Sequence, residues 1–230
     1  LNVAPETLHL CRKLKEELVH LPKERLYWEF EKLFLKSSHP ASGLRFLQEC
    51  EALSLFPELT KLINCPQEPE WHPEGDVWYH TLLVIDEAAR LCQEGKEDEE
   101  TTLTILFAAL CHDLAKPATT KQDDGRIRSR GHENGGEKPT RTFLERLGVS
   151  KRIIETVVQL VKEHLKPYQL YAARDHVSDA ALKRLALRAP IKELCLLARA
   201  DCFGRTTPEA LAHKDIATDW LWAQSQRLQL

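Results

Sequence analysis

The chain has 230 residues, of which 43% are hydrophobic and 29% are charged, and its formal net charge is −3. This length is enough to bury a core without disulfides, and it favours one main domain with a smaller appendage. The small net charge excludes a strongly basic surface for duplex nucleic acid, so any phosphate binding must be local.

The cysteine pattern and the apolar runs predict a cytoplasmic protein. The seven cysteines are scattered, with no close pair suited to zinc, so we expect reduced thiols. The longest apolar run, near residues 103–111, is too short to cross a bilayer, and no signal peptide opens the chain. Methionine is absent even at position 1, so either the start was processed or the sequence is a piece of a longer chain.

Residues 1–64 are predicted to form an N-terminal helical segment. Apolar residues recur at helical spacing over 6–20 and again over about 23–36. A third helix is expected to run to about Phe56, and Pro57 begins a short fourth one. These helices carry little chemistry, and we interpret them as packing elements.

Residues 65–230 are predicted to form the main, all-α domain, which begins with an extended, proline-rich link. Asp124-Gly125 between two short polar runs predicts a small hairpin at the rim of a site. Pro117 disfavours helical geometry at Lys116, so the central helix should end there. Ser150 and Ser178 are expected N-caps. Helices are expected over about 76–93, 99–116, 139–148, 150–165, 178–189 and 190–203, and a last one up to about 228.

The predicted central helix ends in an adjacent His112 and Asp113 after an almost wholly apolar run. At helical spacing, Asp113 lies over Leu110 and Leu106, on a side that should be buried. An ionised carboxylate in such surroundings needs a partner, and a metal ion is a natural one. The partial negative charge at the carbonyl end of the helix also favours a bound cation.

Other histidines and aspartates project from the apolar faces of other predicted helices, namely His80, His164 and Asp201. A single buried histidine is more often a hydrogen-bonded core residue than a ligand, but two carboxylates on apolar faces need compensation. His132, on a glycine-flexed turn, is a further candidate ligand, with an exposed loop histidine as the alternative. The histidines interpreted as surface residues are His9, His20, His39, His176 and His213.

Imidazole and carboxylate ligands without thiolate suit Mn, Fe, Ni, Co or Mg with open positions better than structural zinc. Water on such a metal becomes a nucleophile and the ion polarises a phosphoryl oxygen, so we expect hydrolysis of a phosphate ester. Lys116, three residues past Asp113, and Arg205, four past Asp201, are placed to pair with substrate phosphate. The alternative for both is an ordinary surface charge.

The spacing of His80, His112-Asp113 and Asp201 resembles the H…HD…D signature of the HD superfamily of metal-dependent phosphohydrolases. Longer motifs resemble the HD domain attached to bacterial tRNA nucleotidyltransferases, the CCA-adding enzymes. They are WHPEGDVWYHTLL (71–83), LCHDLAKP (110–117), RGHENGG (130–136), KEHL (162–165) and ARADCFGR (198–205). Upstream, GLRFLQECEALSLFPELTKL (43–62) resembles the helical segment that precedes that domain.

This resemblance implies an HD-domain helical bundle with an N-terminal helical appendage. It also implies hydrolysis of 2′,3′-cyclic phosphates, 2′-nucleotides and simple phosphomonoesters with one or two divalent ions such as nickel, magnesium or manganese. The residues that match the family's metal ligands by position are His80, His112, Asp113 and Asp201. His132 and His164 match residues beside them, and could support a second metal with Asp113 bridging.

Nothing in the sequence resembles the glycine-rich, paired-aspartate catalytic head, so we do not expect this chain to add CCA by itself. We predict a cytoplasmic phosphohydrolase in which Asp113 and Lys116 are catalytic and the substrate is a nucleotide or an RNA 3′ end. No membrane partner is expected, and a homodimer is a further option. The alternative is a tRNA-binding or dimerising C-terminal module of a longer nucleotidyltransferase with little activity of its own. A purely structural helical domain ranks last, because it leaves two acidic residues on apolar faces unexplained.

Overall fold

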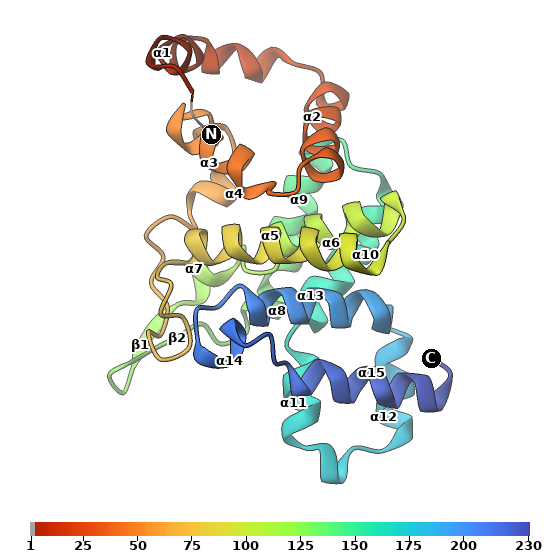
Figure 1. The fold of residues 1–230 in the computed structure, drawn as a ribbon. Coiled ribbons are helices and arrows are strands. Elements are labelled where there is room, and N and C mark those ends of the chain that lie inside the picture. Colours follow the sequence, from red (N-terminus) through yellow and green to blue (C-terminus); the bar gives the residue numbers. More distant parts are fainter. Residues whose placement is uncertain (1–2) are drawn as a thin grey trace.

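The computed structural model describes residues 3–230, which are almost entirely helical (Figure 1). The N-terminal part comprises α1 (Pro5–Leu14), η1 (Lys15–His20), α2 (Lys23–Lys36), α3 (Ala41–Glu49), η2 (Ala52–Leu55) and α4 (Pro57–Thr60). The middle part comprises α5 (Val77–Gly95), α6 (Glu99–Cys111), α7 (Lys116–Thr119), α8 (His132–Gly135), α9 (Glu137–Leu147) and α10 (Lys151–Glu163). The C-terminal part comprises α11 (Lys166–Ala172), η3 (Arg174–His176), α12 (Asp179–Ala186), α13 (Ile191–Phe203), α14 (Pro208–Leu211) and α15 (Ile216–Leu228).

Strands occur in the described residues only as a small hairpin, so the predicted all-α class is confirmed. β1 (Lys121–Asp123) and β2 (Arg126–Arg128) pair antiparallel, with Gln122 opposite Ile127. The turn between them contains Gly125 at φ +73°, which agrees with the predicted Asp124-Gly125 hairpin. In Figure 1 this hairpin projects from the body of the molecule beside α7.

The helix α6 forms the centre of the core. Every residue from Leu103 to Cys111 is buried, as expected for a helix that is apolar all round. α6 packs against α5, α10 and α13, and α2 also contacts it. The carboxylate of Asp98 caps its start by accepting from the Thr101 amide at 2.8 Å. These contacts place the C-terminal end of α6 among three other helices.

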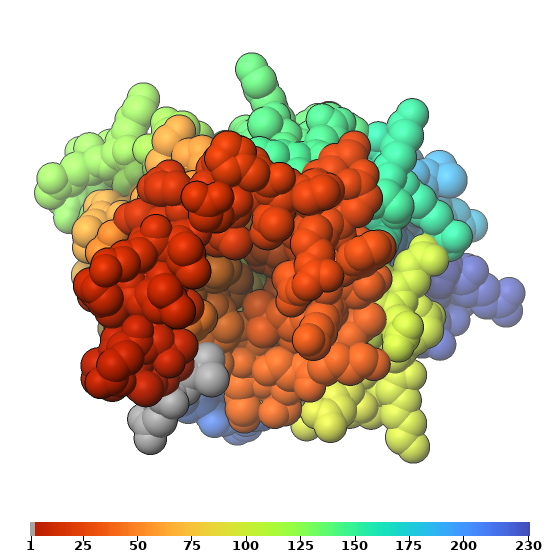
Figure 2. Space-filling model, turned by 90° about the horizontal axis from the view of Figure 1, so that it is seen from above, coloured from red at the N-terminus to blue at the C-terminus, as the bar shows by residue number. Residues whose placement is uncertain are grey.

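Aromatic side chains join the N-terminal part to this core. The rings of Phe34 and Phe107 meet edge to face with centroids 5.0 Å apart, and Phe30 meets Phe143 at 6.4 Å. Seen from above, the N-terminal segment spreads over this face of the molecule (Figure 2). The predicted division into residues 1–64 and 65–230 stays a prediction.

Most predicted helix ends that rest on a local signal agree with the structure. Ser150 and Ser178 are N-caps, accepting from the amides of Ile153 and Ala181 at 3.4 and 3.3 Å. Gly148 ends α9 in the left-handed region at φ +79°, where a glycine costs least. The same region contains Glu51 at φ +62°, and there the predicted third helix breaks into α3 and η2.

The predicted end of the central helix is wrong. α6 ends at Cys111, and Lys116 is the first residue of the short helix α7, with Pro117 second. Proline is compatible with that position because the first amides of a helix have no intrahelical acceptor. The predicted helix over 6–20 is also divided, since its α-helical part ends at Leu14 and continues as η1.

All seven cysteines lie within the described residues and are free thiols. Across residues 3–230, no helix combines the length and the apolar character that a membrane crossing needs.

Gly204 sets the approach of α13 to α5. A Cβ at Gly204 would lie 2.5 Å from Val84 Cγ2, 2.9 Å from Val84 N and 3.0 Å from Val84 Cα. We therefore expect Gly204→Ala to lower the free energy of unfolding by about 1–3 kcal/mol, measured by urea denaturation. Gly95→Ala is the matched control, because its added Cβ would meet only the flexible carboxylate end of Glu97. Equal stability of the two variants would contradict this close approach.

Candidate metal centre

The structure brings together all six histidines and aspartates predicted as metal ligands. They come from five places: His80 in α5, His112 and Asp113 at the end of α6, His132 in α8, His164 at the end of α10, and Asp201 in α13. All six are buried, with His132 the most exposed at 7%. The rings of His112 and His164 are 5.6 Å apart, centre to centre. Of the helices that carry them, α5, α10 and α13 pack against α6, and α8 packs against α10.

The six residues form two groups of three. In each group, ligand atoms of the three residues all lie within 4.8 Å of one another, first for His80, His112 and Asp201 and then for Asp113, His132 and His164. His80 Nε2 is 3.1 Å from Asp201 Oδ1, and His132 Nε2 is 3.3 Å from Asp113 Oδ1. His112 Nε2 lies 3.1 Å from Asp113 Oδ2. Asp113 therefore lies between the two groups.

Three of the histidines are oriented by the backbone. Nδ1 of His112, His132 and His164 lies 2.8, 2.7 and 2.6 Å from the carbonyl oxygens of Ala109, Ser129 and Val161. A carbonyl oxygen only accepts hydrogen bonds, so each Nδ1 carries the proton. In the neutral ring, Nε2 then has a free lone pair. Protein ligands to metals are commonly oriented in this way.

Within the described residues, several buried polar atoms of the centre make no hydrogen bond. They are His112 Nε2 and both carboxylate oxygens of Asp113. In addition, Nε2 of His132 and Nε2 of His164 face each other at 3.2 Å. Two lone pairs at that distance repel unless a proton or a cation lies between them, and unsatisfied buried acceptors are costly. The residues present therefore fit a divalent cation.

Burial and neighbouring charges act in opposite directions on these groups. Burial alone would raise the pKa of Asp113, but His112 and Lys116 hold it well below its usual range. For Asp201 burial would likewise raise the pKa, and Arg205 and His80 lower it. The pKa of His164 is lowered to about 3, mainly by burial and further by the neighbouring His132 and His112, so this ring is neutral near pH 7. Neutral imidazole is the form that binds metals.

The two residues predicted to meet phosphate already contact the aspartates. Lys116 Nζ lies 2.8 Å from Asp113 Oδ2 and donates to Gln67 Oε1 at 2.7 Å. Arg205 Nη2 lies 3.3 Å from Asp201 Oδ2, and its buried Nε has no partner in the protein. Neither side chain is the ordinary surface charge that was the alternative, because Lys116 is 8% exposed and Arg205 is half-buried.

Two residues of the centre were missed from the sequence, His72 and Glu74. Glu74 Oε1 lies 2.8 Å from Nδ1 of both His72 and His80, although the contact to His80 is not aligned as a hydrogen bond. Glu74 Oε2 accepts from the Thr206 amide at 3.2 Å, and its side chain is 0% exposed. Burial would raise the pKa of Glu74, but the hydrogen bond with His72 and the close approach of His80 lower it. The available signal was a carboxylate between two histidines in the motif WHPEGDVWYH.

A hollow of about 240 Å³ opens onto the centre. It is lined by Gln67, Glu68, Trp71, His72, Lys116, Ile127, Ser129, His132 and Arg205. The predicted hairpin contributes Ile127 to its wall, which agrees with a place at the rim of the site. We refer to this hollow as the access pocket.

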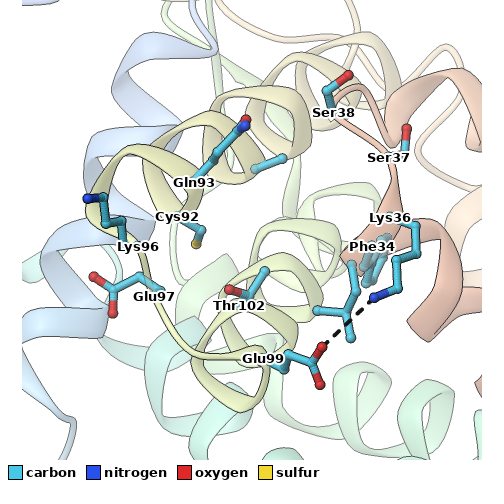
Figure 3. Close-up of a pocket in the computed structure, with 12 residues that line it drawn as sticks. Phe34, Lys36, Ser37, Ser38, Cys92, Gln93, Lys96, Glu97, Glu99 and Thr102 are labelled. Atoms are coloured by element: carbon cyan, nitrogen blue, oxygen red, sulfur yellow. Dashed lines mark ion pairs between the residues drawn. The ribbon is translucent and has the colours of Figure 1, made fainter.

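A larger hollow of about 460 Å³ lies at the opposite end of α6 (Figure 3). It is formed by the C-terminal ends of α2 and α5 and shares no residue with the metal centre. Its acidic residues are already paired, Glu99 with Lys36 at 3.9 Å and Glu97 with Lys192 at 2.6 Å. No histidine lines it, so the candidate chemistry belongs to the access pocket.

Two families match this chain. Residues 77–206 match the HD domain, and residues 1–63 match the family described as the probable RNA and SrmB-binding site of polymerase A. Similar curated proteins include three named multifunctional CCA protein. That of Actinobacillus pleuropneumoniae (serotype 5b, strain L20) is 34% identical over 210 residues, covering 89% of this chain and 49% of the relative. That of Laribacter hongkongensis is 33% identical over 225 residues, covering 94% and 52%, and that of Pasteurella multocida 33% over 227 residues, covering 96% and 52%.

This chain spans about half the length of the curated relatives it matches. The HD match covers more than half of this chain and includes every helix that contributes a histidine or aspartate to the buried centre. The chain therefore belongs to the HD domain family.

Proposed function

We propose that this chain is a metal-dependent phosphohydrolase acting on phosphate esters of nucleotides or RNA 3′ ends. The substrates would be 2′,3′-cyclic phosphodiesters, 2′-nucleotides or phosphomonoesters. The observation that carries the proposal is the buried Asp113 carboxylate, unpartnered by hydrogen bonds and facing the oriented Nε2 atoms of His112 and His132. The nitrogen and oxygen donors of the whole centre suit Mn, Ni, Co, Fe or Mg. A bound ion would acidify water and polarise the phosphoryl oxygen.

The residues of the chain divide into metal ligands and residues that would bind the substrate phosphate. His80, His112 and Asp201 would hold one ion, and Asp113 with His132 and His164 would hold a second. Lys116 and Arg205 line the access pocket and would orient the phosphate with their positive charges. Lys116 also contacts Asp113, so these two residues are the proposed catalytic pair.

The test is an assay of purified protein on 2′,3′-cAMP after chelation and reloading with a single metal. We expect chelated protein to be inactive and at least one of Mn, Ni, Co, Fe and Mg to restore hydrolysis. The product is read as 2′- or 3′-AMP by chromatography. Inactivity with all five metals would exclude the proposed hydrolysis.

A second candidate function is RNA binding by a module of a longer nucleotidyltransferase. It is favoured by the match of residues 1–63 to an RNA-binding family and by the half-length coverage of the relatives. Tight binding of tRNA, measured by fluorescence anisotropy, without hydrolysis on any metal would favour this second function. A cytoplasmic location and a homodimer remain predictions.

Glu74 provides a sharper test of the metal site, because it contacts His80 from outside the ligand set. Removing its charge should disturb the orientation and basicity of His80, and such outer residues commonly change metal affinity about 10- to 100-fold. We expect Glu74→Gln to weaken Mn²⁺ binding by this factor in titration calorimetry. Glu70→Gln is the control, since Glu70 lies in the same link but is 52% exposed and pairs only with Arg126. Unchanged Mn²⁺ affinity in Glu74→Gln would show that Glu74 does not contribute to the metal site.

A further inference from the structure

Trp71 forms one wall of the access pocket and is exposed. Its exposed fraction is 53%, whereas the neighbouring Trp78 is 3% exposed and donates its indole N–H to Gln48 Oε1 at 2.7 Å. Within residues 3–230, Trp71 stacks on no other aromatic ring. A tryptophan that is half exposed and whose indole N–H makes no hydrogen bond leaves a large apolar face in water. Such a face is available for a ligand.

The backbone that carries Trp71 is well held. The amides of Trp71 and His72 donate to the Glu68 carbonyl at 3.1 and 2.9 Å. The Glu68 carboxylate accepts from the Ile127 amide at 2.8 Å, which ties this turn to β2. Trp71 is therefore presented by a turn that is fixed to the hairpin, and Ile127 supplies a second apolar side chain in the same pocket.

The access pocket is also lined by positively charged side chains. Lys116 and Arg205 carry this charge, and each contacts an aspartate of the proposed metal centre. A ligand suited to this pocket has an anionic group joined over a short distance to a flat, apolar ring. A nucleotide phosphorylated on its ribose combines these two features. At about 240 Å³ the pocket is smaller than typical ligand sites, which are roughly 300–1,000 Å³, so we expect it to take no more than one nucleotide.

We infer that Trp71 is a stacking platform for the nucleobase next to the reacting phosphate, and that it makes the enzyme selective for nucleotides over base-free phosphate esters. This inference rests on the proposed function. Stacking on an aromatic side chain tolerates any base, because every base has a π-face. The subsite therefore predicts little discrimination between adenine and cytosine. It also accepts either a free nucleotide or the last nucleotide of an RNA.

The kinetic test compares Trp71→Ala with the wild-type protein on three substrates. These are 2′,3′-cAMP, a short RNA ending in a 2′,3′-cyclic phosphate, and glycerol 1,2-cyclic phosphate, which has no base. We expect kcat/KM to fall roughly 5- to 100-fold for a substrate with a base and to change less than about twofold for the glycerol ester. Loss with 2′,3′-cAMP identifies a mononucleotide source, and loss with the RNA alone identifies an RNA end. An equal loss on all three, or no loss on any, would overturn the inference.

Two variants control for a general effect. Trp71→Phe keeps a ring and should retain most of the activity. Trp28→Ala removes a tryptophan of similar exposure, 56%, from α2, and should not change the ratio of nucleotide to glycerol ester hydrolysis. Trp71→Phe behaving as Trp71→Ala would argue against stacking.

A binding measurement separates this inference from the proposed hydrolysis. The indole N–H signal of Trp71 in ¹H–¹⁵N spectra is assigned by its loss in Trp71→Phe, and the protein is titrated with adenosine, which has no phosphate. We expect the signal to shift with adenosine and not with glycerol. A shift without hydrolysis would leave the subsite standing while the proposed function fails. Hydrolysis without a shift would remove the subsite and leave the function.

Discussion

Asp113→Asn is expected to lower the rate of 2′,3′-cAMP hydrolysis by on the order of 10³-fold, as does loss of a central electrostatic group in other active sites. Asp113 Oδ1 lies 3.3 Å from His132 Nε2, and Oδ2 lies 3.1 Å from His112 Nε2 and 2.8 Å from Lys116 Nζ. Asparagine preserves the shape of the side chain but removes the charge that a cation and Lys116 share. The rate is measured in metal-loaded protein, and circular dichroism checks the fold.

Asp86→Asn is the matched control for this substitution. Asp86 is a half-buried carboxylate on α5, which also carries His80, but it accepts from the Ala41 amide at 2.9 Å and its ion-pair partner is His39, not a residue of the metal centre. The asparagine oxygen can accept the same hydrogen bond, so this variant should retain full activity. Equal activity in Asp113→Asn and wild-type protein would show that any hydrolysis occurs elsewhere.

Metal loading is expected to raise the melting temperature of the chelated protein by about 5–10 °C. A ligand present at 100 times its Kd and bound only to the folded state adds about 2.7 kcal/mol, and a chain of this size shifts roughly 2–4 °C per kcal/mol. The physical reason is that His112 Nε2 and the two oxygens of Asp113 are buried and make no hydrogen bond, so a bound cation would gain their interactions. The measurement is differential scanning calorimetry with EDTA and then with excess Mn²⁺.

Two histidine variants decide where the stabilising ion binds. His112→Ala should lose most of the increase in melting temperature, because it removes a ligand from the centre. His176→Ala removes an exposed histidine from η3 and should keep the full increase. The same melting temperature with EDTA and with every metal tested would contradict a divalent site in this fold.

Local sequence signals predicted helix ends well where they act within a few residues. Ser150 and Ser178 cap their helices, and Gly148 ends α9, because each effect depends only on neighbouring backbone groups. The end of α6 was predicted less well. Pro117 disfavours helical geometry at Lys116 only as a tendency. Here Pro117 is the second residue of α7, where a proline is tolerated, so Lys116 can begin a helix. The break at Glu51 has no local signal, since a non-glycine residue adopts the left-handed region there.

Helical periodicity also predicted which polar side chains face the core. His80, Asp201 and His164 lie on apolar faces of their helices, and all three are buried in the structure. Periodicity does not apply to the proline-rich link, so no face could be assigned to His72, Glu74 or Trp71. For these residues only the packing of the link against α5 and the loop after α13 decides their surroundings.

The all-α class, the motifs of the HD family and the burial of the candidate ligands could be predicted from the sequence, because they depend on spacing along single helices. The division of the ligands into two groups around Asp113, and the contacts of Glu74 with His72, His80 and the Thr206 amide, depend on tertiary packing. It also decided that Trp71 shares a pocket with Lys116 and Arg205. Distances between helices depend on side chains far apart in the chain, such as the contact of Gly204 with Val84.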